Sequence, residues 1–195
     1  GSVATPGIAT HGGGTFTAYT SALGVGGGNH RSLGMIATDL DNDRDIDMVV
    51  LNDDAPPQLF TNDRNDRFTE IFRKAGPGIE TASRALTVAD FNRDGAMDFF
   101  LSGGEQGRNF LLLNKGDGSL QADSRSAALL ARVSRWGSGV LDYDRDGDLD
   151  LYLLGEKDGG SLWENAGDGS FAFAGRLTGF AAGGGSAAAD LNGDG

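Results

Sequence analysis

Residues 142–150 read DYDRDGDLD, and variants of this stretch recur along the chain. Residues 90–98 read DFNRDGAMD, residues 39–47 read DLDNDRDID, and a shorter copy, DLNGDG, starts at Asp190. The first aspartates of successive copies lie 51, 52 and 48 residues apart. Regular spacing of this size indicates a repeat protein with a unit of about 50 residues.

A second motif recurs with the same period. It is a turn sequence that begins with asparagine and ends with a large apolar residue: NDRNDRF at 62–68, NKGDGSL at 114–120 and NAGDGSF at 165–171. A degenerate copy, HGGGTF, occupies residues 11–16. Because two motifs share one period, a chance match is improbable, and the repeat is the basis for predicting the fold.

Each complete repeat contains four short runs of apolar, β-branched and aromatic residues, which predict strands. The runs are 35–40, 46–51, 58–61 and 68–72 in the first repeat, 85–91, 97–101, 109–113 and 119–122 in the second, and 139–143, 149–154, 161–164 and 170–174 in the third. A helical repeat is disfavoured, since no unit holds two apolar runs of helical length and period. We therefore expect an all-β fold made of β-propeller blades, each with four antiparallel strands. Residues 126–133 (SAALLARV) are predicted to form a short helical connector.

The repeat divides the chain into three complete blades and two incomplete ones within a single propeller domain. We expect blades at 31–75, 82–124 and 134–176, the tail of a blade at 1–23 and the head of another at 183–195. In the third blade 29 residues separate the first aspartate from the turn aromatic, whereas joining the two chain ends gives only 21. One strand is therefore missing. The prediction is a partial ring, either a fragment of a longer propeller or a unit that self-associates through open blade edges.

Composition narrows the classes of partner. The 195 residues include 33 glycines and no cysteine, and the net charge is -12. An acidic surface repels nucleic acid and anionic membranes, and a chain without cysteine has no disulfides or cysteine-based metal sites. No apolar run approaches the length needed for membrane insertion. Much of the acidic charge lies in the repeated aspartate stretches, where it calls for a local cation.

The aspartate stretches have the composition of calcium-binding loops. In residues 142–150 the carboxylates of Asp142, Asp144, Asp146 and Asp150 can converge with the main-chain carbonyl of Asp148 if the backbone curls tightly. Such a set suits Ca²⁺, which accepts six to eight oxygens, better than the strictly octahedral Mg²⁺. Gly147 stands where the curl requires a positive φ angle, which glycine adopts without a Cβ clash.

The remaining copies depart from this pattern to different degrees. Residues 39–47 carry Arg44 in place of the glycine, which costs about 1–2 kcal/mol at positive φ and puts a cation near the metal. We expect two to three calcium sites, with the first weak and a fourth incomplete. The predicted ligands in these copies are Asp39, Asp41, Asp43, the Asp45 carbonyl and Asp47; Asp90, Asn92, Asp94, the Ala96 carbonyl and Asp98; and Asp190, Asn192 and Asp194.

Two other interpretations of the aspartate stretches, hairpin turns and EF-hand loops, agree less well with the sequence than calcium loops of a propeller do. Ordinary Asp-Gly hairpin turns would account for one copy, but five aspartates in nine residues resist joint ionisation unless a cation screens them. An EF-hand or dockerin loop needs an acid at its twelfth position and a helix beyond it. The twelfth positions here are Val50, Leu101 and Leu153, all within predicted strands.

These residues resemble the FG-GAP or VCBS-type repeats of integrin α-subunit propellers and of many secreted bacterial proteins. The resemblance rests on DLDNDRDID, DFNRDGAMD and DYDRDGDLD, each followed by an apolar strand, and on the N-x-G-D-G-S-[FL] turns. It implies a propeller of usually seven blades, with calcium loops on one rim that link the first two strands of a blade. It says almost nothing about the ligand.

The function implied is an extracellular or cell-surface binding or adhesion module, rigidified by calcium, for a protein or glycan. The alternative is a structural scaffold within a larger secreted protein or enzyme. We do not expect catalysis, because His11 and His30 are the only neutral-pH bases and neither accompanies a nucleophile motif. Four residues that precede the innermost strands are candidates for contacting an acidic or sugar ligand: Arg31, Arg84, Arg135 and Trp136. The simpler alternative is that the arginines are exposed and balance the charge of an acidic surface.

Overall fold

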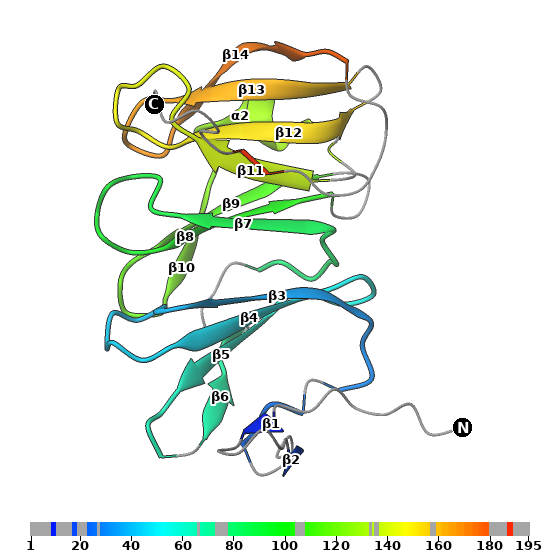
Figure 1. Ribbon diagram of the computed structural model, residues 1–195, viewed down its shortest axis with the longest axis vertical. Helices are drawn as coiled ribbons and strands as arrows, with labels where there is room; N and C mark the ends of the chain where they lie inside the picture. Colours follow the sequence, from blue (N-terminus) through cyan, green and yellow to red (C-terminus); the bar gives the residue numbers. More distant parts are fainter. Residues whose placement is uncertain are drawn as a thin grey trace.

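The computed structural model describes residues 9–10, 17–18, 23–26, 28–65, 67–72, 78–103, 108–132, 134, 137–156, 159–179 and 187–188. Within these residues the chain forms three four-stranded antiparallel sheets, which we call blades 1 to 3 (Figure 1). A short pair, β1 (Ala9–Thr10) and β2 (Thr17–Ala18), precedes them. The all-β prediction is confirmed.

Each blade is a meander in which every strand pairs with the next one along the chain. The positions predicted from the sequence hold closely, because turn motifs separate the apolar runs. Blade 1 contains β3 (Ser32–Thr38), β4 (Asp47–Asn52), β5 (Gln58–Asn62) and β6 (Phe68–Glu70). Blade 2 contains β7 (Ala85–Ala89), β8 (Asp98–Ser102), β9 (Phe110–Asn114) and β10 (Leu120–Asp123). Blade 3 contains β11 (Gly137–Leu141), β12 (Asp150–Glu156), β13 (Gly159–Asn165) and β14 (Phe171–Leu177).

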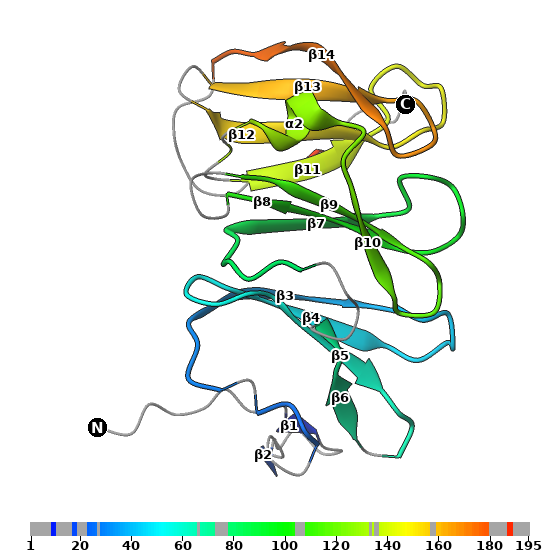
Figure 2. The same ribbon diagram turned by 180° about the vertical axis from the view of Figure 1, so that it is seen from behind.

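The three blades stack face to face in sequence order, as both views show (Figures 1 and 2). The middle blade is therefore buried on both faces. Successive side chains of a strand point to opposite faces, so Phe99 and Leu101 of β8 enter the core shared with blade 1 while Phe100 enters the core shared with blade 3. This is why β8 has a continuous apolar run rather than an alternating one.

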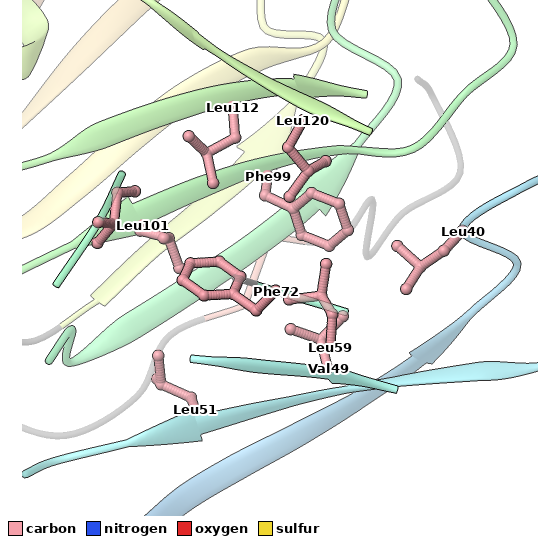
Figure 3. Packing of buried hydrophobic residues seen from close by; sticks show 10 residues of the cluster. Leu40, Val49, Leu51, Leu59, Phe72, Phe99, Leu101, Leu112 and Leu120 are labelled. Carbon is pink, nitrogen blue, oxygen red and sulfur yellow. The ribbon is translucent and has the colours of Figure 1, made fainter. Parts of the chain in front are cut away.

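Two hydrophobic cores fill the spaces between the blades. The core between blades 1 and 2 is shown in Figure 3. It contains Leu40, Val49, Leu51, Leu59, Phe72, Ile79, Phe99, Leu101, Leu112 and Leu120. The core between blades 2 and 3 contains Ala89, Phe91, Phe100, Leu111, Leu113, Leu129, Leu151, Leu153, Trp163 and Phe171.

The predicted connector is a single helical turn, α2 (Ala127–Leu130), that lies against blade 3 (Figure 2). It is shorter than expected. Ser126 makes no side-chain cap, because its hydroxyl accepts a 2.8 Å hydrogen bond from the Phe171 N–H of blade 3 instead. Leu129 anchors the turn in the second core with a fully buried side chain. Nowhere in the described part of the chain is a helix long and apolar enough to cross a membrane.

Candidate metal centre

The predicted aspartate loops join the first and second strands of the three blades. We call residues 39–47, 90–98 and 142–150 loops 1, 2 and 3. All three project from the same side of the stack, on the left in Figure 1. The fourth predicted site, at Asp190, Asn192 and Asp194, lies outside the described residues.

The backbone of each loop enters the left-handed region at its fourth and sixth residues. The sixth position was expected, with φ angles of 87° at Gly95 and 88° at Gly147, and Arg44 is held at 74° as the sequence predicted. The fourth position was not predicted, because no glycine marks it. Its residues and φ angles are Asn42 (58°), Arg93 (59°) and Arg145 (65°).

The first aspartate of each loop holds this curl together. Asp90 accepts hydrogen bonds from the backbone N–H groups of Asp94 (3.1 Å) and Gly95 (2.9 Å). Asp39 and Asp142 accept from the equivalent sixth residue, at 3.0 Å each. The loop conformation is therefore set by its own ligand candidates.

Loops 1 and 3 bring three carboxylates together at the same positions. One oxygen from each of Asp39, Asp41 and Asp43 lies within 4.8 Å of the others, and so do oxygens of Asp142, Asp144 and Asp146. Two oxygens bound to one Ca²⁺ at 2.3–2.6 Å can be at most about 5 Å apart, so the spacing fits one shared ion. In loop 1, Asp41 also buries an oxygen that has no hydrogen-bond partner.

Loop 2 follows the same curl with a weaker set of charges. Asn92 replaces the second carboxylate, and its amide donates to Asp94 at 2.9 Å while its oxygen accepts from the Asp94 N–H at 3.1 Å. Asn92 keeps an oxygen ligand but lowers the negative charge of the loop.

The last aspartate of each loop, Asp47, Asp98 or Asp150, is almost completely buried. Both carboxylate oxygens of Asp98 accept backbone hydrogen bonds, from the Phe91 N–H at 3.0 Å and the Asn114 N–H at 2.8 Å. Equivalent pairs of bonds hold Asp47 and Asp150. These aspartates fasten each loop to the turn between the third and fourth strands of its own blade.

Four of the loop carboxylates are destabilised in their ionised form: Asp41, Asp47, Asp98 and Asp150. Burial raises the pKa of Asp98 to about 6, despite its two backbone hydrogen bonds. Burial also raises the pKa values of Asp41, Asp47 and Asp150, and the charges of Asp43 and Asp39 add to the shift at Asp41. A bound cation would reverse these costs, so the donor set fits Ca²⁺ in chemistry as well as in spacing.

The seventh residue of each loop was predicted to bind metal through its main-chain carbonyl. In loops 1 and 3 this residue is an aspartate, Asp45 or Asp148, and its carboxylate pairs with an arginine. The Asp148 side chain forms an ion pair with Arg93 of loop 2, which links two loops directly. The Asp45 side chain pairs with Arg64 of its own blade, and Arg64 also donates to the Asp43 carbonyl. Loop 1 therefore has a guanidinium at its edge in addition to Arg44.

Two asparagines that reach between blades were not assigned a role from the sequence. The Asn114 amide of blade 2 donates to the Leu40 carbonyl of loop 1 at 2.7 Å, and the Asn165 amide of blade 3 donates to the Phe91 carbonyl of loop 2 at 2.8 Å. The partners are 74 residues apart in both cases. The sequence did carry a signal, because these asparagines open the second repeated motif.

Arg31 and Arg84, two of the arginines predicted to contact a ligand, lie on the opposite rim, just before the first strands of blades 1 and 2. Arg31 lies 3.2 Å from one carboxylate oxygen of Asp53 and Arg84 lies 3.9 Å from the other, so the structure brings both arginines to one aspartate. Beside them is a pocket of about 390 Å³ lined by Asp53, Asp54, Glu80, Thr81, Ala82, Arg84 and Gly103. Arg135 and Trp136 lie outside the described residues.

Comparison with known families identifies the repeat. The family described as FG-GAP-like repeat matches residues 39–101, 93–153 and 142–195, and two of these matches begin at the first aspartate of a loop. The chain belongs to the FG-GAP-like repeat family. This confirms the resemblance found in the sequence.

Individual relatives of this FG-GAP-like chain are distant. Mouse (Mus musculus) Cartilage acidic protein 1 is 29% identical over 154 residues, which cover 73% of this chain and 23% of that protein. Among solved structures, a lectin from Agrocybe aegerita described as recognising non-reducing terminal N-acetylglucosamine aligns with a TM-score of 0.45 and 21% identity. That alignment covers 71% of this chain and 36% of the lectin chain.

Proposed function

We propose that this chain binds Ca²⁺ in loops 1 to 3 and that the calcium-stabilised blades serve outside the cell as a binding module for a protein or glycan. The observation that carries the calcium proposal is the convergence of three carboxylates at identical positions of loops 1 and 3. Membership of the FG-GAP-like repeat family and the relationship to Cartilage acidic protein 1 support an extracellular setting. Millimolar extracellular calcium would load loop sites of modest affinity.

We expect the three sites to differ in affinity. Loop 3 combines three converging carboxylates with Gly147 at the strained position, so it should bind most tightly. Loop 2 has one carboxylate fewer because of Asn92. Loop 1 has the carboxylates but is strained by Arg44 at positive φ and has the Arg64 guanidinium beside it.

Calorimetric titration with calcium tests the metal proposal. The wild-type protein should bind two to three ions, and Asp144→Asn should weaken the tightest site about tenfold or more, because it removes a charged ligand. Glu80→Gln is the matched control, since it removes one acidic charge on the opposite rim and should leave the titration unchanged. No heat of binding, or equal isotherms for wild type and Asp144→Asn, would refute the proposal.

The rim that carries Arg31, Arg84 and Asp53 is the surface we propose for the ligand. It pairs guanidinium donors with carboxylate acceptors beside a pocket, the combination that recognises hydroxyl and acidic groups. A glycan and protein array should give calcium-dependent binding that Arg84→Ala abolishes and Arg67→Ala, on blade 1, does not. An array without any binding would favour the scaffold role instead.

We propose no catalytic activity for this chain. The loop acids occur as equivalent clusters, whereas carboxylate catalysis requires two acids in unlike environments. His30 lies 3.7 Å from Asp54 on the ligand rim and has no nucleophile motif near it in the sequence. The net charge of -12 also disfavours nucleic acid as the partner.

A further inference from the structure

We infer that Asn114 and Asn165 couple the metal loops of consecutive blades, so that filling one loop strengthens binding in the next. This inference rests on the proposed calcium function and concerns residues that lie outside the predicted ligand set. Both asparagines are buried, with at most 2% of their surface exposed. Each makes its interblade bond to the second residue of a loop.

The bonds form a continuous path through the stack. In loop 1, the Leu40 N–H donates to Asp47 at 2.7 Å, and the Leu40 carbonyl accepts from the Asn114 side chain. The backbone N–H of Asn114 then donates to Asp98, the last predicted ligand of loop 2. The position of Asn114 therefore depends on both loops at once.

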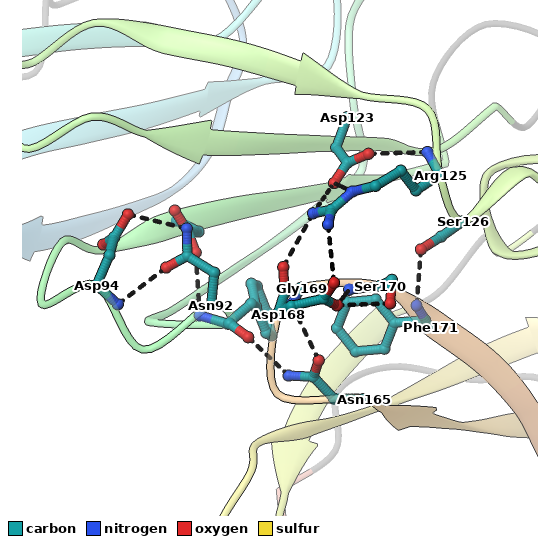
Figure 4. A network of polar contacts seen from close by, with 12 residues as sticks. Asn92, Asp94, Asp123, Arg125, Ser126, Asn165, Asp168, Gly169, Ser170 and Phe171 are labelled. Atoms are coloured by element: carbon teal, nitrogen blue, oxygen red, sulfur yellow. Dashed lines mark hydrogen bonds and ion pairs between the residues drawn. The ribbon is translucent and has the colours of Figure 1, made fainter.

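The same arrangement repeats one blade later. The Phe91 N–H donates to Asp98 at 3.0 Å, and the Phe91 carbonyl accepts from Asn165. The Asn165 N–H donates to Asp150 of loop 3 at 2.8 Å. Figure 4 shows Asn165 reaching from blade 3 to the backbone of loop 2.

Loops 2 and 3 have further links, which predict stronger coupling there. Arg93, the fourth residue of loop 2, pairs with Asp148, the seventh residue of loop 3. The equivalent residues of loops 1 and 2 are Asn42 and Ala96, which cannot form an ion pair. Arg125 of blade 2 also binds the blade 3 turn through the Asp168 carboxylate at 3.0 Å and the Asp168 carbonyl at 2.9 Å (Figure 4).

Because the hydrogen bonds of this path are buried, the groups that they join must move together. A buried donor or acceptor without a partner is costly, so a shift of loop 2 that broke the Phe91 bond would have to be matched by a shift of Asn165 and Asp150. Metal binding fixes the carboxylates of a loop and thus favours one position of its second residue. Coupling of this kind is reciprocal between the two sites.

Terbium is the probe for the test, because its luminescence is sensitised by a nearby tyrosine. Tyr143 is the second residue of loop 3, whereas loops 1 and 2 have Leu40 and Phe91 there, so the signal reports loop 3. The paired substitution D90N and D94N removes the charges of the two loop 2 aspartates that are not buried, and each asparagine keeps one oxygen acceptor for the curl. Tyr143→Phe should abolish the signal and so confirms its origin.

The coupling is measured by comparing the effect of D90N with D94N on the terbium affinity of loop 3 in wild type and in Asn165→Asp. In wild type, D90N with D94N should lower the terbium affinity of loop 3 about fivefold or more at physiological ionic strength. In Asn165→Asp, the same pair should lower it by less than about threefold, because the amide donor to Phe91 is gone and only the links through Arg93 and Arg125 remain. Asn165→Asp keeps an oxygen for the N–H groups of Gly167 and Gly169, and Asn165→Ser serves if Asp impairs folding.

Asn62→Asp is the matched control. Asn62 occupies the same turn position in blade 1, and in the described residues its amide donates at 3.4 Å to Ile46 of its own loop. The fivefold effect should persist in Asn62→Asp. An equal effect of D90N with D94N in wild type and Asn165→Asp, or no effect in wild type, would overturn the coupling alone. A protein that gives no terbium signal at all would overturn both the coupling and the metal proposal.

Discussion

Arg44 is the residue that we expect to lower the calcium affinity of loop 1. It holds a φ of 74° where loops 2 and 3 have glycine, and it adds a positive charge to the loop that carries Asp39 and Asp43. Arg44→Gly should remove a strain of about 1 kcal/mol and raise the calcium affinity of loop 1, measured by calorimetric titration. Arg44→Asn separates the causes, because asparagine tolerates this conformation but has no charge. Equal affinities in all three proteins would show that neither strain nor charge limits loop 1.

We expect Asp98 to make the proposed calcium binding sensitive to pH. Its pKa of about 6 in the metal-free protein lies above the ordinary 3.8, so the folded state holds the proton more tightly than the unfolded chain does. The contribution of Asp98 to stability without metal therefore rises as pH falls through 6 toward 3.8, while calcium affinity falls because the ion requires the anion. Melting curves at pH 7 and pH 5, with and without calcium, should show the calcium-induced shift shrink at pH 5. A shift that is the same at both pH values would contradict this role.

Predictability from sequence differs among residues of the same loop. The convergence of the carboxylates in loops 1 and 3 and the positive φ at the sixth residue followed from spacing and from the glycines of loops 2 and 3. The positive φ at Arg93 and Arg145 did not, because arginine rarely adopts it and nothing in the motif marks the fourth position. The raised pKa of Asp98 was also hidden, since it depends on burial beneath turns distant in sequence.

At the scale of elements, the strands should owe their stability to the cores between blades. Phe99 in β8 is 1% exposed and packs between blades 1 and 2 (Figure 3). Phe99→Ala should therefore lower the free energy of unfolding by about 3–5 kcal/mol in denaturant titrations. Met35→Ala, at a side chain that is 59% exposed on β3, is the control and should change stability by no more than about 0.5 kcal/mol. A small effect of Phe99→Ala would mean that the blades hold together by different means.

The strands were predictable because two signals agreed. Apolar runs of strand length alternated with glycine and asparagine turns at a fixed period, so the order of the twelve strands in blades 1 to 3 followed directly. The sequence did not show which face of β8 meets which neighbour, since both faces are apolar. Nor did it show the interblade bonds of Asn114 and Asn165, because their partners lie 74 residues away.

At the scale of the whole molecule, the stack behaves as a row of units that contact only their neighbours. In the part of the chain that is described, the junction of blades 2 and 3 has the Arg93–Asp148 pair, the Arg125–Asp168 pair and the Ser126–Phe171 bond in addition to its core. Amide hydrogen exchange should therefore be slower in blade 3 than in blade 1. Equal protection across the blades would show that the stack opens as a single cooperative unit.

The central claim is that calcium stabilises these blades, and the melting temperature tests it most directly. Calcium at about one hundred times its Kd should stabilise the folded protein by about 2.7 kcal/mol per site, and chelation should remove that gain. The account predicts a higher Tm with calcium than with chelator, a smaller rise with magnesium, and little rise in a variant with D41N, D94N and D144N together. Identical melting curves with calcium and with chelator would contradict it.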